Sequence, residues 1–129
     1  MERNQQFDER YLAFGAEVLK LVASLPRTMA CRHIADQMFR SGTSVGAHLQ
    51  EARAAESRAD FIHKFQIALK EMRETCYWLA LLKKSGLGDS DLITDLATES
   101  YELTAILAKS VLTAKQNAGI SVSSNGRSR

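Results

Sequence analysis

A chain of 129 residues, 45% hydrophobic and 25% charged, has the composition of one soluble globular domain with enough apolar residues to bury a core. One proline and seven glycines leave long uninterrupted segments, which favours helices and argues against a β-sandwich with its many turns. A net charge of +2 is too weak by itself to indicate nucleic-acid binding.

The cysteine content and the hydropathy pattern bear on the compartment. Cys31 and Cys76 are too few for a disulfide scaffold, and no secretory signal pattern precedes them. No run of 18 apolar residues occurs, so we expect no transmembrane helix and no membrane partner. The sequence therefore predicts a cytoplasmic protein with two reduced thiols.

The first half of the chain predicts two helices. Over about residues 6–25, apolar residues recur at intervals of four and three until Pro26 ends the pattern: Phe7, Tyr11, Phe14, Val18, Leu21 and Leu25. The same spacing continues over about residues 29–55 and passes through the small and polar stretch 40–52. Each glycine in that stretch costs the helix about 1 kcal/mol, which the close approach of another helix backbone would offset.

The second half predicts two more helices. Ser57 and Asp60 have the spacing of an N-cap and its third residue, so a helix is expected over residues 58–85. Its main apolar stripe is Phe61, Phe65, Ala68, Met72, Cys76 and Leu79. Gly86 and Gly88 end this helix, and Asp89 or Ser90 caps the last one, over 90–117.

Short connections between four such helices predict an all-α fold, an antiparallel up-down four-helix bundle within residues 1–118. Residues 119–129 are rich in Ser and Gly and lack an apolar face, so we expect a disordered tail.

Some apolar residues of the third helix fall outside its main stripe. These residues are Ile67, Trp78, Leu81 and Leu82. A Trp-centred apolar arc is typical of an interface between subunits. It would equally arise if the third helix were flanked on two sides within its own bundle.

A third arc of the same helix is basic with one aromatic residue. It contains Lys70, Arg73, Tyr77 and Lys84, and Arg53 and Arg58 could extend it. This composition is expected where a phosphate backbone is bound and a base can stack. An ordinary solvent-facing helix strip has the same composition.

The second helix carries a ladder of polar residues on a face next to the core. Its members are His33, Gln37, Arg40, Ser44, His48 and Glu51. Such a ladder predicts a buried hydrogen-bond network or a seam between subunits. Arg40 and Glu51 are the expected charged partners in it, because a charge on such a face is costly unless it is paired.

Catalytic and metal motifs are weak in this chain. His48-x-x-Glu51 and Asp60-x-x-His63 resemble half of a di-iron site, but one pair is reversed and the other has Asp in place of Glu. Ser44 lies one helical turn from His48, yet a helix interior offers no oxyanion hole. No phosphate-binding loop, nucleophile elbow or Cys-x-x-Cys is present. We therefore expect no enzyme, no metal site and no cofactor.

Several motifs occur in a characteristic order along the chain. They are Arg40-Ser-x-Thr-Ser-Val-Gly-Ala, Glu51-Ala, Arg58-x-Asp-Phe-Ile, Lys64-x-x-Ile-Ala-Leu-Lys-Glu, Glu74-Thr and Tyr77-Trp-Leu. Together they resemble the bacterial four-helix bundle proteins encoded within 23S ribosomal RNA intervening sequences, over residues 7–110. Where that family usually has Asn, this chain has His48.

The resemblance implies a cytoplasmic bundle that assembles as a ring-like homopentamer and has no established enzymatic activity. The family is also similar to the accessory variability protein of diversity-generating retroelements, a pentameric basic bundle that binds nucleic acid and a reverse transcriptase. This similarity would make Lys70, Arg73 and Lys84 candidates for contact with a nucleic-acid backbone. We therefore expect a non-enzymatic homo-oligomer that binds RNA or DNA through phosphate contacts. The alternative is a protein–protein adaptor or assembly protein that binds no nucleic acid.

Overall fold

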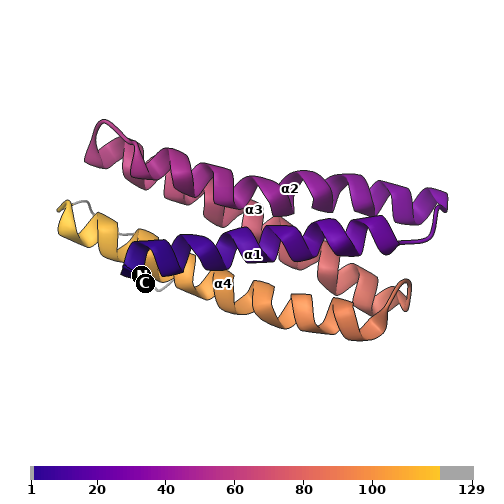
Figure 1. Cartoon of the computed structure of the whole chain (residues 1–129). Helices are drawn as coiled ribbons and strands as arrows, with labels where there is room; N and C mark the ends of the chain where they lie inside the picture. Colours follow the sequence, from indigo (N-terminus) through magenta and orange to yellow (C-terminus); the bar gives the residue numbers. More distant parts are fainter. Residues whose placement is uncertain (1, 120–129) are drawn as a thin grey trace.

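The structure, a computed structural model, describes residues 2–119, and these residues form four helices (Figure 1). They are α1 (Arg3–Ser24), α2 (Met29–Arg53), α3 (Arg58–Ser85) and α4 (Ser90–Asn117). The disordered tail predicted for residues 119–129 lies, from residue 120 on, outside the described residues. Within residues 2–119 no helix is long and apolar enough to cross a membrane.

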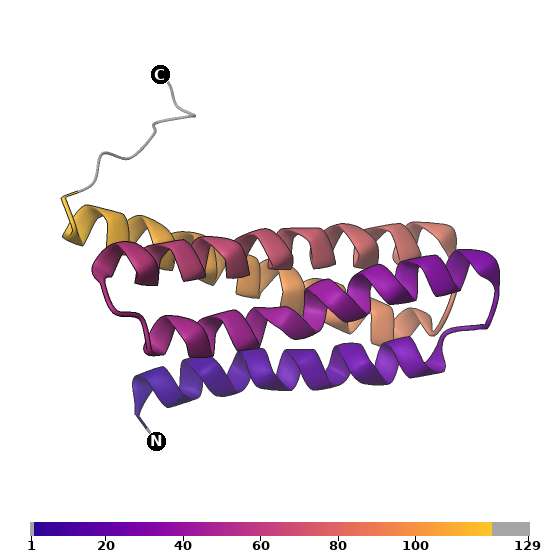
Figure 2. The same ribbon diagram turned by 90° about the horizontal axis from the view of Figure 1, so that it is seen from above.

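Each helix runs antiparallel to the one before it, and consecutive helices pack side by side (Figure 2). The all-α fold predicted from the sequence is confirmed. The α1–α4 contact, which closes the bundle, is the least extensive of the four helix pairs. It is fixed by a hydrogen bond of 2.8 Å from the Tyr11 hydroxyl to the Leu103 carbonyl and by a bidentate ion pair between Arg10 and Glu99.

Local capping sets the ends of the helices. The Ser57 side chain accepts a hydrogen bond from the Asp60 amide at 3.0 Å, and Asp89 does the same for Leu92, as the capping signals predict. α1 begins at Arg3, earlier than expected, because the Gln5 side chain accepts a hydrogen bond from the Glu2 amide and satisfies the end of the helix. α3 ends at Gly86, which adopts a positive φ of 74°.

The core stripe of α3 differs from the predicted one. Leu82, which the sequence placed in the exposed arc, is fully buried, whereas Cys76 and Phe61 are only half-buried. Six of the eight buried positions of α3 alternate by three and four residues: Phe65, Ala68, Met72, Thr75, Leu79 and Leu82. The other two, Ile62 and Leu69, lie beside this stripe. The stripe is a heptad-type repeat of 3.5 residues per turn, and a projection at 3.6 residues per turn drifts from it by about 20° per heptad. Over three heptads the drift moves Leu82 out of the calculated core.

The small residues of α2 have two different environments. A Cβ added to Gly42 would lie 2.9 Å from Cγ1 of Val18, so α1 and α2 approach closely there, as the glycine predicts. A Cβ added to Gly46 would meet nothing within 4 Å. The close approach of a helix within the chain therefore explains Gly42 and not Gly46.

Candidate functional surfaces

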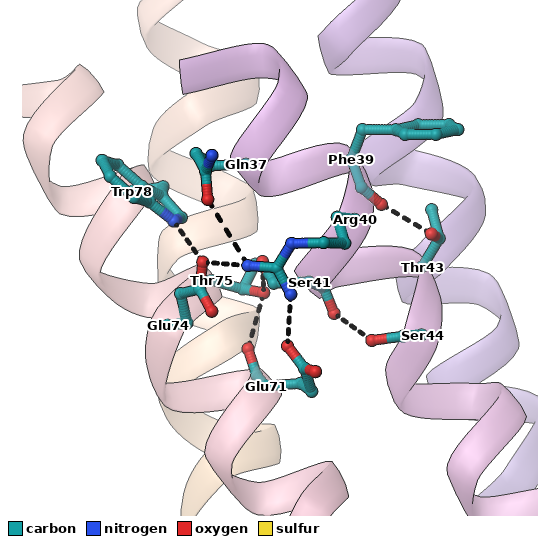
Figure 3. Close-up of polar contacts among 10 residues, drawn as sticks. All are labelled: Gln37, Phe39, Arg40, Ser41, Thr43, Ser44, Glu71, Glu74, Thr75 and Trp78. Atoms are coloured by element: carbon teal, nitrogen blue, oxygen red, sulfur yellow. Dashed lines mark hydrogen bonds and ion pairs between the residues drawn. The ribbon is translucent and has the colours of Figure 1, made fainter. Parts of the chain in front are cut away.

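A polar cluster joins the middle of α2 to α3 (Figure 3). The Arg40 guanidinium donates to Oε2 of Glu74 at 2.6 Å and to Oε1 of Glu71 at 3.4 Å. The same Glu74 oxygen accepts the Trp78 indole N–H at 3.0 Å. The Glu74 carboxylate therefore bonds both to Arg40 of α2 and to Trp78, one turn further along α3.

Glu74 keeps its charge in this cluster. Burial tends to raise the pKa of its carboxyl, but the hydrogen bonds from Trp78 and Arg40 outweigh burial, so the pKa lies below its usual value. The Arg40 side chain remains about half exposed, so solvent screens the pair and its contribution to stability is small.

The ladder predicted on α2 lies along the boundary with α3, the α2–α3 seam, and is not a buried network, because the side chains of Arg40 and Glu51 are 54% and 53% exposed. Its charged members pair with residues of α3. Glu51 accepts a hydrogen bond from Lys64 at 3.0 Å, and this lysine is the main reason that the pKa of Glu51 lies below its usual value. Ser44 donates to the carbonyl of Ser41 within α2. The charged residues of the ladder therefore bond across to α3, and the ladder does not form a continuous series of hydrogen bonds along α2.

His48 is the unsatisfied member of the seam. Its Nδ1 atom is buried without a hydrogen-bond partner among the described residues and lies 3.7 Å from Oε1 of Glu51. Among these residues no group of three or more His, Cys, Asp or Glu side chains could hold a metal ion.

The apolar arc predicted as a subunit interface is mostly covered by the bundle itself. Leu82 is buried in the core, and Ile67 and Trp78 are half-buried. The Trp78 ring packs edge-on against His33 of α2, with the centroids 5.8 Å apart. Of the four residues only Leu81 is exposed, and α2 covers Trp78 through His33.

The basic strip on α3 has the exposure that the sequence predicts. Lys70, Arg73, Tyr77 and Lys84 are all exposed, and among the described residues none of the three cations forms an ion pair. Tyr77 is 59% exposed and offers a ring to solvent. We call these four residues the α3 strip.

Arg53 does not extend the α3 strip. Its guanidinium makes a bidentate pair with Asp8 of α1, at 2.8 and 3.1 Å, and lies over the rings of Phe7 and Phe65. It therefore joins α1, α2 and α3 at one end of the bundle. Arg58 is exposed, but it lies at the first turn of α3, about 18 Å along the helix from Lys70.

A groove lies between α1 and α2, where the sequence predicts no site. Its volume is about 1020 Å³, and it is lined in the middle by Leu12, Gly15, Ala16, Leu19, Gly46 and Ala47. Its polar end is lined by Gln5, Asp8, Glu9 and Gln50. Leu12 is 64% exposed and Leu19 is 46% exposed, which is high for leucine. We call this feature the α1–α2 groove.

A signal for the groove was present in the sequence. Leu12, Ala16, Leu19 and Ala23 recur at intervals of four, three and four, one or two residues after positions of the core stripe of α1. These residues form a second apolar stripe, which broadens the apolar face of the helix beyond what the core of one bundle needs.

The comparisons with known proteins agree with the fold and the motifs. The family model for the 23S rRNA-intervening sequence protein matches residues 4–109. The chain belongs to this family. No functionally curated protein matches the chain.

A solved structure from the S23 ribosomal protein family is similar to this chain. It is a protein of unknown function from Bacteroides thetaiotaomicron, 35% identical in sequence, with a TM-score of 0.75. The similarity covers 81% of this chain and 97% of that one.

Some residues of the motifs by which this chain resembles the 23S rRNA-intervening sequence proteins lie in the α2–α3 seam, whereas Arg58, Lys70 and Tyr77 of the same motifs are exposed. Arg40 and Ser41 come from the first motif, and Glu74, Thr75 and Trp78 come from the last two. Their contacts are with one another, across α2 and α3. These five residues therefore serve the packing of the bundle, whereas Lys70 and Tyr77 of the motifs belong to the exposed α3 strip.

Proposed function

We propose that this family member is a non-enzymatic homo-oligomer, a pentameric ring, that binds RNA or DNA through phosphate contacts on the α3 strip. The observation that carries the nucleic-acid part is the exposure of Lys70, Arg73 and Lys84 without ion-pair partners among the described residues. From Lys70 to Lys84 the strip spans about 21 Å of helix, the length of about six phosphates along one strand of a duplex. Tyr77, between the cations, offers a ring on which an unpaired base can stack.

The α3 strip can be tested by charge reversal. Lys70→Glu with Arg73→Glu should abolish retention of labelled RNA in a filter assay, because phosphate contacts are lost and repulsion replaces them. The matched control is Arg27→Glu with Arg32→Glu, which makes the same change in net charge at exposed positions around the α1–α2 turn. Retention that falls equally in both variants, or in neither, would reject the strip as the site.

The salt response gives an independent measurement. Phosphate-driven binding to single strands should weaken with salt, with a log–log slope of about −0.7 for each phosphate contacted. Three cations predict a slope of about −2 for the contacts of one subunit, and Lys84→Gln should reduce its magnitude by about 0.7. The oligomeric part is tested separately, by the light-scattering mass of the parent protein without nucleic acid.

A second candidate function is an assembly or adaptor protein that binds no nucleic acid. The α1–α2 groove favours it, because an apolar groove with exposed leucines is typical of a protein-binding surface. Under this alternative, reversal of Lys70 and Arg73 would leave partner binding unchanged, and partner binding would depend only weakly on salt.

A further inference from the structure

We propose that a hollow between α3 and α4 binds an unpaired base of a nucleic-acid strand, with Tyr101 as the stacking surface and Lys83 and Lys84 as contacts to the flanking phosphates. This inference rests on the nucleic-acid binding of the proposed function and adds to it the chemical form of the ligand, a single strand. Bases inside a duplex are paired and stacked on one another, so they offer no free face to the ring of Tyr101.

The hollow is continuous with the α3 strip. Its volume is about 410 Å³, within the range of about 300–1,000 Å³ that is usual for ligand pockets. Lys84 belongs both to the strip and to the lining of the hollow, and Tyr77 of the strip lies one turn before Ala80 on the same face of α3. A strand bound along the strip would therefore reach the hollow. The lining residues are Ala80, Lys83, Lys84, Ala97, Thr98 and Tyr101, and we call this feature the α3–α4 hollow.

The α3–α4 hollow has a floor of small residues and an aromatic wall. Ala97 is buried and Ala80 is half-buried, so the two side chains leave space between the helices. Tyr101 is 56% exposed, and among residues 2–119 its ring packs on no other aromatic ring. A tyrosine ring with a free face is a stacking surface for a base of any sequence.

The wall of the α3–α4 hollow also carries a polar group that suits a base. The Thr98 hydroxyl donates its proton to the Thr94 carbonyl at 3.0 Å. Its oxygen keeps lone pairs that can accept a hydrogen bond from the amino group of a base. Ring and hydroxyl lie one turn apart on α4, so one base could contact both.

The charge of the α3–α4 hollow favours an anion. Lys83 and Lys84 are both exposed, and neither forms an ion pair among the described residues. None of the lining residues is acidic. The carboxylates of α3 that bond to Arg40 face α2, away from the hollow. The phosphates next to a base in the hollow would therefore meet two free lysines.

The carboxylates of α4 also lie away from the α3–α4 hollow. Glu99 and Glu102 bond to Arg10 of α1. Asp95 lies one turn before Glu99 on the same face of α4. Asp91 is in the first turn of α4, before the residues that line the hollow. α4 thus directs most of its acidic residues towards α1 and an uncharged face towards the hollow.

The test compares strands that carry the same phosphates with and without bases. The probes are a labelled oligodeoxyadenylate, an abasic strand with the same number of phosphates, and the oligodeoxyadenylate paired in a duplex. Fluorescence anisotropy measures the affinity of the full chain for each probe. The parent protein should bind the oligodeoxyadenylate more tightly than the abasic strand, because only the former offers unpaired bases.

The decisive variant is Tyr101→Ala. It should weaken binding of the oligodeoxyadenylate by roughly 5- to 150-fold, the effect of losing one stacked base, and leave the affinities for the abasic strand and the duplex unchanged. Tyr101→Phe keeps the ring and should retain the parent affinity. Phe39→Ala, at an aromatic residue of α2 that is 50% exposed, is the matched control and should change none of the three affinities.

Two further variants complete the set. Tyr101→Leu, which keeps an apolar side chain without a ring, takes the place of Tyr101→Ala if circular dichroism shows that the alanine variant has lost helicity. Lys83→Gln tests the phosphate contact of the α3–α4 hollow outside the α3 strip. It should reduce the magnitude of the log–log salt slope by about 0.7.

The possible failures are distinguishable. A parent protein that binds none of the probes overturns the nucleic-acid part of the proposed function and this inference with it. Equal affinity of the parent for the oligodeoxyadenylate and the abasic strand overturns this inference alone and leaves the phosphate contacts of the α3 strip in place. The same holds if Tyr101→Ala weakens both strands equally or neither. Tighter binding of polyglutamate than of the oligodeoxyadenylate would show that the lysines hold an acidic peptide, and would also overturn the inference.

Discussion

Ser41 of α2 and Thr75 of α3 meet in the core, with their hydroxyl oxygens 2.8 Å apart and both residues fully buried. Thr75 also donates to the carbonyl of Glu71, at 2.8 Å, so its single hydroxyl proton is already used. Ser41 must therefore be the donor to Thr75. This directional pair sets the axial position of α2 against α3, where apolar residues alone would tolerate sliding.

Removal of the acceptor should cost more than removal of the donor. Thr75→Val conserves shape but leaves the buried Ser41 hydroxyl without its partner, and we expect a loss of roughly 1–3 kcal/mol in the free energy of unfolding. Ser41→Ala should cost about 1 kcal/mol, because the Thr75 proton keeps its own acceptor. The double variant should lose less than the sum of the two. Denaturant unfolding of all four proteins measures the coupling, and additive losses would contradict the pair.

Two glycines of α2 should respond in opposite directions to the same substitution. Gly42→Ala places a Cβ 2.9 Å from Val18 Cγ1, in a core where Val18 is fully buried, so we expect a net loss of about 1–2 kcal/mol. Gly46→Ala meets no atom within 4 Å and should stabilise the monomeric bundle by about 1 kcal/mol, through helix propensity.

The stabilities of the parent and the two glycine variants are compared by their midpoints in denaturant unfolding, provided that the dependence of the unfolding free energy on denaturant is the same. Val18→Ala in the Gly42→Ala background removes the clash and tests its cause. Gly42→Ala should lower the free energy of unfolding less when residue 18 is alanine than when it is valine. If the change is the same in both cases, the close approach of α1 and α2 does not explain this glycine.

The capping residues show why the helix ends could be predicted. Ser57 and Asp89 bond to amides three residues away, so the interaction is complete within a segment that sequence alone displays. The core of α3 was predicted only in part, because most of its buried positions follow a 3.5-residue repeat and not the 3.6-residue period of a straight helix. Leu82 was misplaced for that reason.

Pairing across helices could not be predicted from one helix at a time. Arg40 was expected to need a partner, but the choice of Glu71 and Glu74 depends on how α3 is rotated about its axis beside α2. Arg53 was misassigned for the same reason, since its partner Asp8 is 45 residues away in sequence. The α1–α2 groove needed both the second stripe of α1 and the position of Gly46 on α2.

Arg53 should matter for stability and not for nucleic-acid binding. Its fork holds Asp8 bidentately, and its Cζ atom lies 5.5 Å from the Phe7 ring centroid and 5.8 Å from that of Phe65. Arg53→Lys keeps the charge but loses the bidentate fork and the guanidinium contact with the two rings, so we expect a loss of roughly 1 kcal/mol in stability. RNA retention should equal that of the parent. Arg58→Lys provides the control at an exposed arginine, and reduced RNA retention by Arg53→Lys would return this residue to the binding surface.

Acid should destabilise the bundle partly through Glu74. Its pKa in the folded chain is depressed, on balance, by the donors Trp78 and Arg40, whereas in the unfolded chain it is near the usual value of about 4.3. The unfolded state therefore binds more protons in the range between the two values, and stability falls as the pH drops through that range. The contribution is complete above the unfolded pKa and is lost below the folded pKa.

Glu74→Gln removes this titrating group, so the pH dependence of the free energy of unfolding should differ between the variant and the parent. At pH 7 the variant should be less stable than the parent, because the Arg40 charge loses its carboxylate, but the difference should shrink as the pH falls from about 5 to about 3. Trp78→Phe removes one of the two donors, so the pKa of Glu74, followed by carboxyl carbon NMR, should rise towards its usual value. If the Glu74→Gln deficit stays constant over this range, the carboxylate at the α2–α3 seam does not couple folding to protonation.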